Sequence, residues 1–338
     1  MPSPPASSTE SAVQRELAAQ RRRHPLELLF WVAAIAAPFL LPRQTLILNE
    51  IAILALFALS LDLILGYAGI VSLGHAAYLG AGAYAAGLLA KHLNADPLTG
   101  LVFAGVLSAA LGLATSLLVL RGADLTRLMV TLGVALVLHE VANSASAWTG
   151  GADGLQGITM APVLGLFPFD LQGRTAYGYS LTILFLLFLI ARRIVHSPFG
   201  LSLRAIRDNS LRASSVAVPV NRRLMAIYTI AAAYAGIAGA LLAQTTQFVS
   251  LDMLEFQRSA DVMLVLIVGG TGYLYGGLIG ALVFKIMQDF LSALTPQYWQ
   301  FWVGLLLVVF VIAGRDRMHK GVAWIVRRRR PVVPAKVA

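Results

Sequence analysis

The chain has 338 residues, of which 58% are hydrophobic and 12% charged, and its formal net charge is +10. A soluble domain usually carries about a quarter of charged residues, and a soluble core of this size could not bury so much apolar surface. We therefore expect lipid to solvate most of the chain, and the absence of cysteine excludes disulfides and thiolate metal sites.

The first 26 residues are rich in Pro, Ser, Ala and Arg, and we expect a disordered basic cytoplasmic N-terminus. No small-residue cleavage site follows the next apolar run, so this segment is not a secretory signal. A membrane span needs about 20 mostly apolar residues. On that scale residues 27–314 form an all-α polytopic transmembrane bundle of eight to ten spans, with broken or half helices. Candidate spans lie near 27–42, 47–66, 73–90, 98–120, 127–147, 178–195, 223–247, 259–270, 277–293 and 299–314.

Basic residues gather in four places beside the apolar runs. They are Arg21–Arg23, the pair Arg121 and Arg127, seven arginines between 192 and 223, and Arg327–Arg330. Cytoplasmic loops of membrane proteins are enriched in Lys and Arg, so we place all four in the cytoplasm. The ten-span interpretation separates them by even numbers of spans. Residues 315–338 would then be a basic cytoplasmic tail, and residues 148–177 a turn-rich loop on the opposite, periplasmic side.

A glycine-rich segment follows the second apolar run. Ile51–Leu65 and Ser72–Leu89 are compatible with one kinked helix, two helices, or two half-helices around Gly66 and Gly69, with Gly74 close behind. One explanation is close helix packing, because small residues let helices approach in lipid. The other is an unwound segment along a solute pathway, since irregular backbone at membrane depth must line a cavity or be buried. The residues that would then line the pathway are Ser72, His75 and Tyr78, although a lone histidine is often simply bonded to a carbonyl.

The segment Gly269–Gly280 presents the same choice, because its glycines argue against one regular helix. The glycines expected to break it are Gly270, Gly272 and Gly276. Three acids also fall within apolar runs, where a charge is costly and usually has a reason. They are Asp62, Glu140 and Asp261. A structural pair, an interface position, a solute contact and a proton relay are all compatible with them, and the last would suit an ion-gradient-driven secondary transporter.

The predicted cytoplasmic loop 196–222 contains a short amphipathic helix. Pro198 and Gly200 break the preceding span, and Leu201–Ala213 favours a helix. A four-residue spacing puts three polar residues on one helix face, namely Arg204, Asp208 and Arg212. The residues on the other side are Leu203 and Ile206, while Arg207 and Leu211 blur the division. A solvated loop explains the arginines alone. A helix that docks into a cleft of another protein also explains the ordered Leu and Ile.

Several catalytic motifs are absent from the sequence. It has no Gly-x-x-x-x-Gly-Lys-[Ser/Thr] phosphate loop, so we do not expect this chain to hydrolyse ATP. It also lacks His-Glu-x-x-His, metal-ligand spacing and a Gly-x-Ser-x-Gly elbow. A membrane enzyme therefore has little support.

The loop sequence Ser197-Pro-Phe-Gly-Leu-Ser-Leu-Arg-Ala-Ile-Arg-Asp-Asn resembles the coupling loop of the branched-chain amino acid permeases of ABC importers. Four other stretches are similar to the same family and occur in its order. They are Leu65-Gly-Tyr-Ala-Gly-Ile-Val-Ser-Leu-Gly-His-Ala-Ala-Tyr, Thr149-Gly-Gly-Ala-Asp-Gly-Leu, Ala235-Gly-Ile-Ala-Gly-Ala-Leu and Val268-Gly-Gly-Thr-Gly-Tyr-Leu-Tyr-Gly-Gly-Leu-Ile-Gly-Ala. The departures are Asp62 for the usual asparagine, Ser210 for an acidic residue, and Ala313-Gly-Arg-Asp-Arg for Pro-Arg-Gly.

The resemblance implies a permease subunit of the bacterial inner membrane that imports leucine, isoleucine and valine. Urea or short amides are the next substrates, and sugars the third. The implied partners are a second permease, two cytoplasmic ATPases and a periplasmic binding protein. The chain would bind no cofactor and no nucleic acid, since ATP is used by the ATPases. The residues implied to couple to the ATPases are Leu203, Arg204, Ile206, Arg207, Asp208, Leu211 and Arg212.

Overall fold

The computed structural model describes residues 25–93, 96–122, 124–170, 172–294, 296–298, 300–305 and 308. These residues are mainly helical, with isolated β-bridges at Leu155–Val249 and Val163–Phe167, which confirms the all-α prediction. The chain divides into two units, Met1–Leu282 and Val283–Ala338, and each is described by itself. The basic tail 315–338 and the N-terminus up to residue 24 lie outside the described residues, as does much of the predicted span 299–314.

Six helices in the described part of the chain are long and apolar enough to cross a membrane. They are α3 (Thr45–Leu65), α5 (Pro97–Val119), α6 (Asp124–Ser144), α8 (Arg174–Val195), α11 (Val220–Thr246) and α13 (Leu274–Leu294). Three further helices are shorter or less apolar, namely α2 (Pro25–Leu40), α4 (Ala76–Leu93) and α12 (Phe256–Gly269). These three bring the candidates to nine, and the tenth predicted span, 299–314, lies largely outside the described residues.

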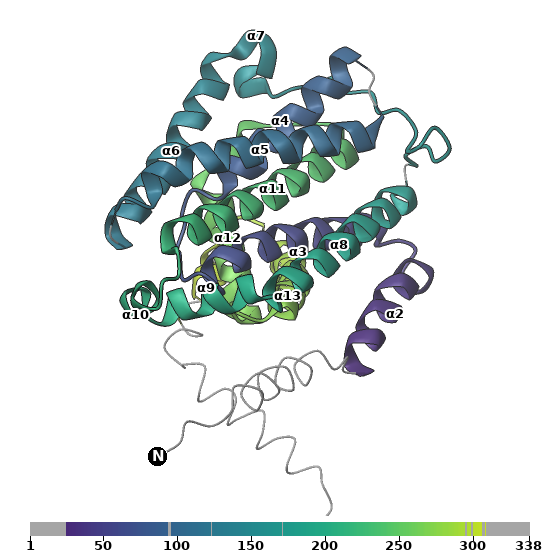
Figure 1. The fold of residues 1–338 in the computed structure, drawn as a ribbon. Coiled ribbons are helices and arrows are strands. Elements are labelled where there is room, and N and C mark those ends of the chain that lie inside the picture. The colour runs from purple at the N-terminus through teal and green to yellow at the C-terminus, as the bar shows by residue number, and fades with distance from the viewer. Residues whose placement is uncertain are drawn as a thin grey trace, which may run out of the picture. The chain divides into compact units, whose positions relative to one another are not determined.

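Shorter elements connect the long helices. They are α7 (Ser146–Thr149), α9 (Pro198–Asp208), α10 (Ser210–Ser215) and the 3₁₀ turns η1 (Gly151–Asp153) and η2 (Leu251–Leu254). Figure 1 shows α7 on one side of the helical bundle and the α9–α10 pair on the opposite side. The second unit continues α13 from residue 283 and contains helical residues 300–305.

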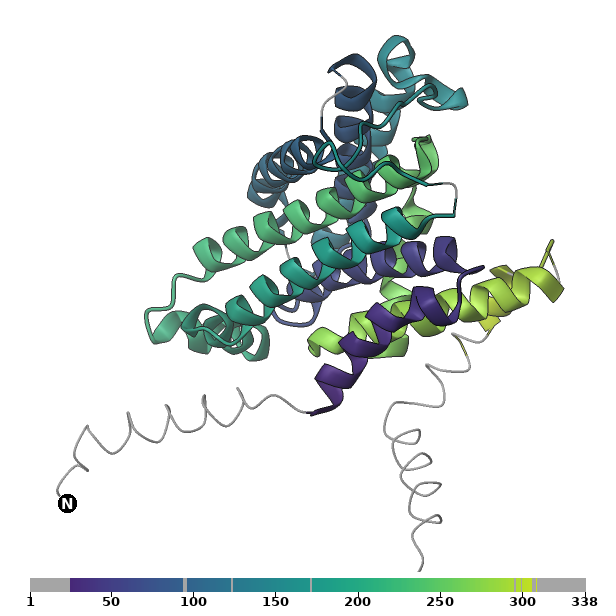
Figure 2. The same cartoon turned by 90° about the vertical axis from the view of Figure 1, so that its right-hand side faces the viewer.

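The centre of the first unit is formed by α11, which packs against α4, α5 and α3, while α3 also packs against α8 (Figures 1 and 2). Glycines allow the closest approaches. A Cβ atom at Gly239 would collide with the backbone of Leu79, and one at Gly82 would collide with the backbone of Gly236. Close packing therefore explains the part of the first glycine-rich segment that lies within α4.

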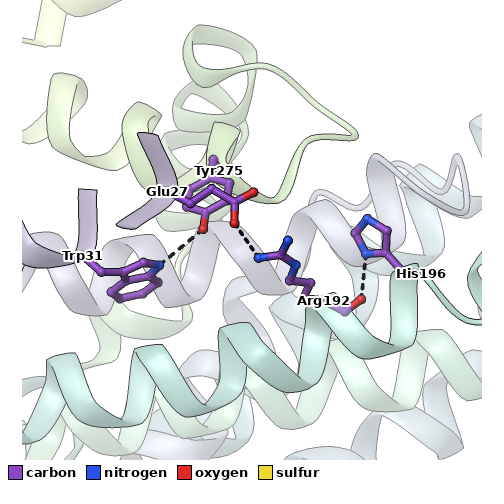
Figure 3. A network of polar contacts seen from close by, with 5 residues as sticks. All are labelled: Glu27, Trp31, Arg192, His196 and Tyr275. Carbon is purple, nitrogen blue, oxygen red and sulfur yellow. Dashed lines mark hydrogen bonds and ion pairs between the residues drawn. The ribbon is translucent and has the colours of Figure 1, made fainter. Parts of the chain in front are cut away.

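The helix α2 is fastened to the bundle at one end by polar contacts (Figure 3). Glu27 pairs with Arg192 of α8 at 2.5 Å, and the Trp31 indole donates to the Tyr275 hydroxyl at 3.3 Å. The Nδ1 atom of His196 lies 2.8 Å from the carbonyl oxygen of Arg192. Beyond these contacts, apolar residues of α2, α3, α8 and α13 line a cavity of about 210 Å³. Composition alone gave no sign of this anchor.

Candidate functional site

The loop between α8 and α11 folds into two helices. Ser197 caps α9, with its Oγ accepting from the Gly200 amide at 3.4 Å, and Pro198 occupies the first turn. The prediction of a single helix over Leu201–Ala213 is wrong, because the backbone of Asn209 is extended, with φ −161°. Its side chain accepts from the Arg212 amide at 2.9 Å and so caps a second helix. Asn side chains compete for backbone hydrogen bonds in this way and favour caps over helix interiors.

The apolar face of α9 is covered by the chain itself. Leu203 and Ile206 are buried, at 0% and 4% exposure, where α9 packs against α8 and α11. They therefore have no surface free for a partner, and Arg212 does not share a helix face with Arg204 and Asp208, because it lies on α10. Several residues at the end of α9 and on α10 are exposed, among them Arg207, Asp208, Leu211 and Arg212. We call Asp208, Leu211 and Arg212 the tip.

Two arginines of α9 instead reach inward to the segment after α3. The guanidinium carbon of Arg204 lies 5.5 Å from the centroid of the Tyr67 ring. The Nη1 atom of Arg207 donates to the carbonyl oxygen of Gly66, and its Nη2 lies 3.4 Å from the Asp208 carboxylate. The cytoplasmic loop predicted from charge is therefore in direct contact with the glycine-rich segment.

That segment is a true break, so the two-helix interpretation is the correct one. Helix α3 ends at Leu65, α4 begins at Ala76, and Gly69 has φ +73°. The Ala76 amide is capped by the Ser259 hydroxyl of α12 at 2.9 Å. At the far end of the break, a Cβ at Gly74 would collide with the Thr131 backbone of α6. Most of the break is thus buried in protein, as irregular backbone at membrane depth must be, while Gly69 and Val71 are exposed.

A second break separates α12 from α13. Gly270 and Gly272 have φ +97° and +79°, which favours glycine at both positions. Gly276 was also predicted to break the helix, and that is wrong, because it lies inside α13. A Cβ there would approach the carbonyl oxygen of Gly269 at 2.9 Å, so Gly276 serves close packing of α13 on the end of α12.

The two breaks meet at Asp62, which is fully buried in α3. Its Oδ1 accepts from the Gly272 amide at 2.7 Å, and its backbone carbonyl accepts from the Gly66 and Tyr67 amides at 2.7 and 3.3 Å. Among the described residues, no hydrogen bond reaches its Oδ2. The carboxylate therefore forms a hydrogen bond with the backbone and does not line an open pathway.

His75 lies at the start of α4 in a buried polar cluster. Its Nε2 is 2.8 Å from the Ser60 hydroxyl, and its ring stacks on Phe57 and meets the edge of Tyr78. Ser60 is placed to donate its single proton to the Phe57 carbonyl at 2.6 Å, an arrangement in which Nε2 is the donor to Ser60. The other nitrogen, Nδ1, is then an acceptor, and no hydrogen bond reaches it from the described residues.

The cluster continues through Tyr78 to α5 and α11. Its hydroxyl donates to Tyr228 at 3.0 Å and lies 2.6 Å from the Thr115 hydroxyl. Ser72 is also buried, at 1% exposure. The structure therefore brings three predicted pathway residues to one end of α4. Sequence reasoning missed Ser60, Thr115 and Tyr228, whose only signal was a polar group within an apolar run.

The other two predicted acids lie elsewhere. Glu140 is exposed on α6 and accepts from Ser144 of its own helix at 3.2 Å. Asp261 is part-exposed on α12, where Gln257 donates to it at 3.2 Å. In the described part of the chain no hydrogen bond connects either acid to His75, and no group of three or more His, Asp or Glu is placed to hold a metal ion. The arrangement gives a proton relay through these acids no support.

Comparisons with known proteins agree on one family. A family model described as "Branched-chain amino acid transport system / permease component" matches residues 45–312. The chain is 25% identical over 303 residues to the high-affinity branched-chain amino acid transport system permease protein LivM of Escherichia coli, covering 83% of this chain and 71% of that protein. It is 27% identical over 250 residues to a probable branched-chain amino acid transport permease protein LivH of Methanocaldococcus jannaschii, covering 71% and 77%. No solved structure matches.

Proposed function

This chain belongs to the family of permease components of branched-chain amino acid transport systems, and we propose that it forms half of the membrane pathway of an ATP-driven importer. In this proposal a second permease supplies the other half. Two cytoplasmic ATPases bind the tip (Asp208, Leu211, Arg212), and a periplasmic protein delivers the solute. The chain itself holds no cofactor, because ATP is consumed by the ATPases. It lies in the inner membrane with both termini in the cytoplasm.

The proposal rests on the two environments of α9, which is buried on one side and exposed at one end. One side of this helix buries Leu203 and Ile206 in the membrane bundle, while the tip is exposed. A helix with one face fixed to the bundle and one end open to solvent can transmit the movement of a docked partner. ATP binding would shift the population between inward-facing and outward-facing arrangements by favouring one of them.

The solute pathway in this proposal passes the start of α4. Leucine, isoleucine and valine combine an apolar side chain with a charged ammonium and carboxylate. The surroundings of His75 match both parts, since its ring stacks on the apolar Phe57, while Nδ1, which no hydrogen bond reaches from the described residues, is available as an acceptor. An ammonium group is the matching donor. We propose that opening of the first break exposes Ser72, His75 and Tyr78 to the solute.

Reconstitution tests the proposal. The chain is placed in proteoliposomes with its second permease and ATPases, and the binding protein is added outside. We expect uptake of labelled leucine, isoleucine and valine to require ATP inside the vesicles and to stop when a proton gradient replaces ATP. Urea and short amides are measured in parallel, and their preferential uptake would replace the substrate assignment while keeping the mechanism. Uptake driven by the gradient alone would overturn the proposal in favour of a secondary transporter.

A further inference from the structure

We propose that Arg207 and Asp62 form a clasp that joins the coupling helix α9 to both glycine breaks, so that a displacement of α9 moves the two breaks together. The clasp is defined by Arg207, Gly66, Asp62 and Gly272. The inference rests on the proposed function, since it assigns the route by which ATPase movement reaches the solute pathway. It also changes the expected role of Arg207, from a residue that docks the ATPase to one that acts within the chain.

The first half of the clasp connects α9 to the end of α3. Arg207 donates to the carbonyl oxygen of Gly66, which follows the last helical residue and would otherwise lack a partner at a helix end. The stem of the arginine lies across Gly69, where a Cβ would approach the Arg207 Cγ at 2.8 Å. Gly69 also needs its positive φ. The positive φ and the close approach of the arginine stem both require glycine at this position. The turn and the packing of the arginine against it therefore depend on the same residue.

The second half connects α3 to the α12–α13 break. The Asp62 carboxylate accepts the Gly272 amide at 2.7 Å. This contact passes beside Gly66, where a Cβ would collide with both the carboxylate and the Gly272 amide. The guanidinium of Arg207 also comes within 3.4 Å of the position that a Cβ at Gly272 would occupy. One arginine therefore reaches both breaks at the point where they cross.

The charge of Asp62 is the reason to regard this contact as more than packing. An asparagine would accept the same hydrogen bond from Gly272, yet the position holds a fully buried acid with one unpaired oxygen. Burying a carboxylate is expensive unless a cation compensates it. Arg207 is the cation beside it, because its Nη1 donates to the Gly66 carbonyl and lies next to Gly272, the partner of the Asp62 carboxylate. Removing Arg207 should leave the buried acid uncompensated and loosen α9 from the breaks, whereas removing the charge of Asp62 leaves Arg207 beside the Asp208 carboxylate.

The test uses the full complex in proteoliposomes and measures ATP hydrolysed per leucine imported. We expect Arg207→Ala to retain ATPase subunits on co-purification and to hydrolyse ATP within about twofold of wild type. Uptake should fall at least tenfold, so that hydrolysis becomes uncoupled. Asp62→Asn should show a weaker loss in the same direction. The matched control is Arg222→Ala, an exposed arginine in the first turn of α11, and it should keep wild-type coupling.

A second measurement separates movement from stability. The chain has no cysteine, so spin labels can be attached at single introduced cysteines. Labels on Tyr273 in the second break and Val106 on α5, both exposed, should change their separation when ATP is trapped. In Arg207→Ala this change should disappear, while Arg207→Lys should restore part of it. If Arg207→Ala does not fold, the change in label separation is compared between wild type and Arg207→Lys instead.

The outcomes distinguish this inference from the proposed function. If wild type shows no ATP-dependent uptake, the proposed function itself fails. If wild type is coupled and Arg207→Ala stays equally coupled, the clasp is wrong while the importer stands. Loss of ATPase co-purification in Arg207→Ala would also overturn the clasp, because it would return Arg207 to the docking surface.

Discussion

At the start of α4 the imidazole of His75 stacks on Phe57 with 5.5 Å between ring centroids, and hydrogen bonds within the described part of the chain reach only one of its nitrogens. Phenylalanine at this position would keep the ring shape and the stacking but remove both nitrogens. We expect His75→Phe to fold with a loss of about 1 kcal/mol, the usual net value of one hydrogen bond. If Nδ1 receives the solute ammonium, the KM for uptake should rise roughly tenfold, equivalent to about 1.4 kcal/mol. Uptake kinetics and thermal unfolding measure the two effects.

Ser60→Ala is the matched control for His75. It removes the same hydrogen bond between Ser60 and the imidazole but leaves Nδ1 in place. We expect its stability to fall by a similar amount and its KM to stay near that of wild type. Equal increases of KM in both variants would mean that the histidine only supports the packing of α4.

At the scale of whole helices, the packing of α4 against α11 depends on glycine. A Cβ at Gly239 would collide with the Leu79 backbone, and backbone cannot rotate away as a side chain can. We expect Gly239→Ala to destabilise the protein by about 1–3 kcal/mol, the usual cost of overpacking. Gly178→Ala on α8 is the control, because its new Cβ would meet no atom of another described segment within 4 Å. Denaturant titration in detergent compares the two, and an equally stable Gly239→Ala would show that the helices can separate freely.

The long helices could be predicted from sequence because lipid imposes a length and a composition on each span. The two breaks were predicted from glycine content, but glycine alone could not separate a turn from close packing. Gly69 and Gly272 have positive φ, whereas Gly276 lies in regular helix. The difference is set by which backbone lies opposite each glycine, and a single sequence does not contain that information.

The coupling loop shows the same limit for side chains. Helical spacing separated Leu203 and Ile206 from the predicted polar face, but it could not say what covers them. Their burial depends on α8 and α11, which approach from opposite ends of the loop in sequence. The break at Asn209 had a local signal, since asparagine favours caps, although the surrounding helix formers concealed it. The inward direction of Arg207 had no signal in the sequence.

At the scale of the whole molecule, α8 fixes the relation between the two large loops. It has 22 residues, which at 1.5 Å per residue gives roughly 33 Å, enough to cross a hydrocarbon core of about 30 Å. Residues 148–173 precede this helix and residues 196–222 follow it. The loops must therefore lie on opposite sides if α8 spans the bilayer, in agreement with the positions of α7 and α9–α10 in Figure 1.

The direction of α8 follows from charge, and it can be tested because the chain has no cysteine. Single cysteines at Leu166 and Leu211, both more than 70% exposed, represent the two loops. The arginines beside Leu211 predict a cytoplasmic position, since basic loops are retained inside. An impermeant maleimide should therefore label Leu166→Cys in spheroplasts and Leu211→Cys only in inverted vesicles. Labelling of both from one side would contradict a spanning α8. The reverse pattern would keep the span but place the tip outside, where no ATPase could reach it.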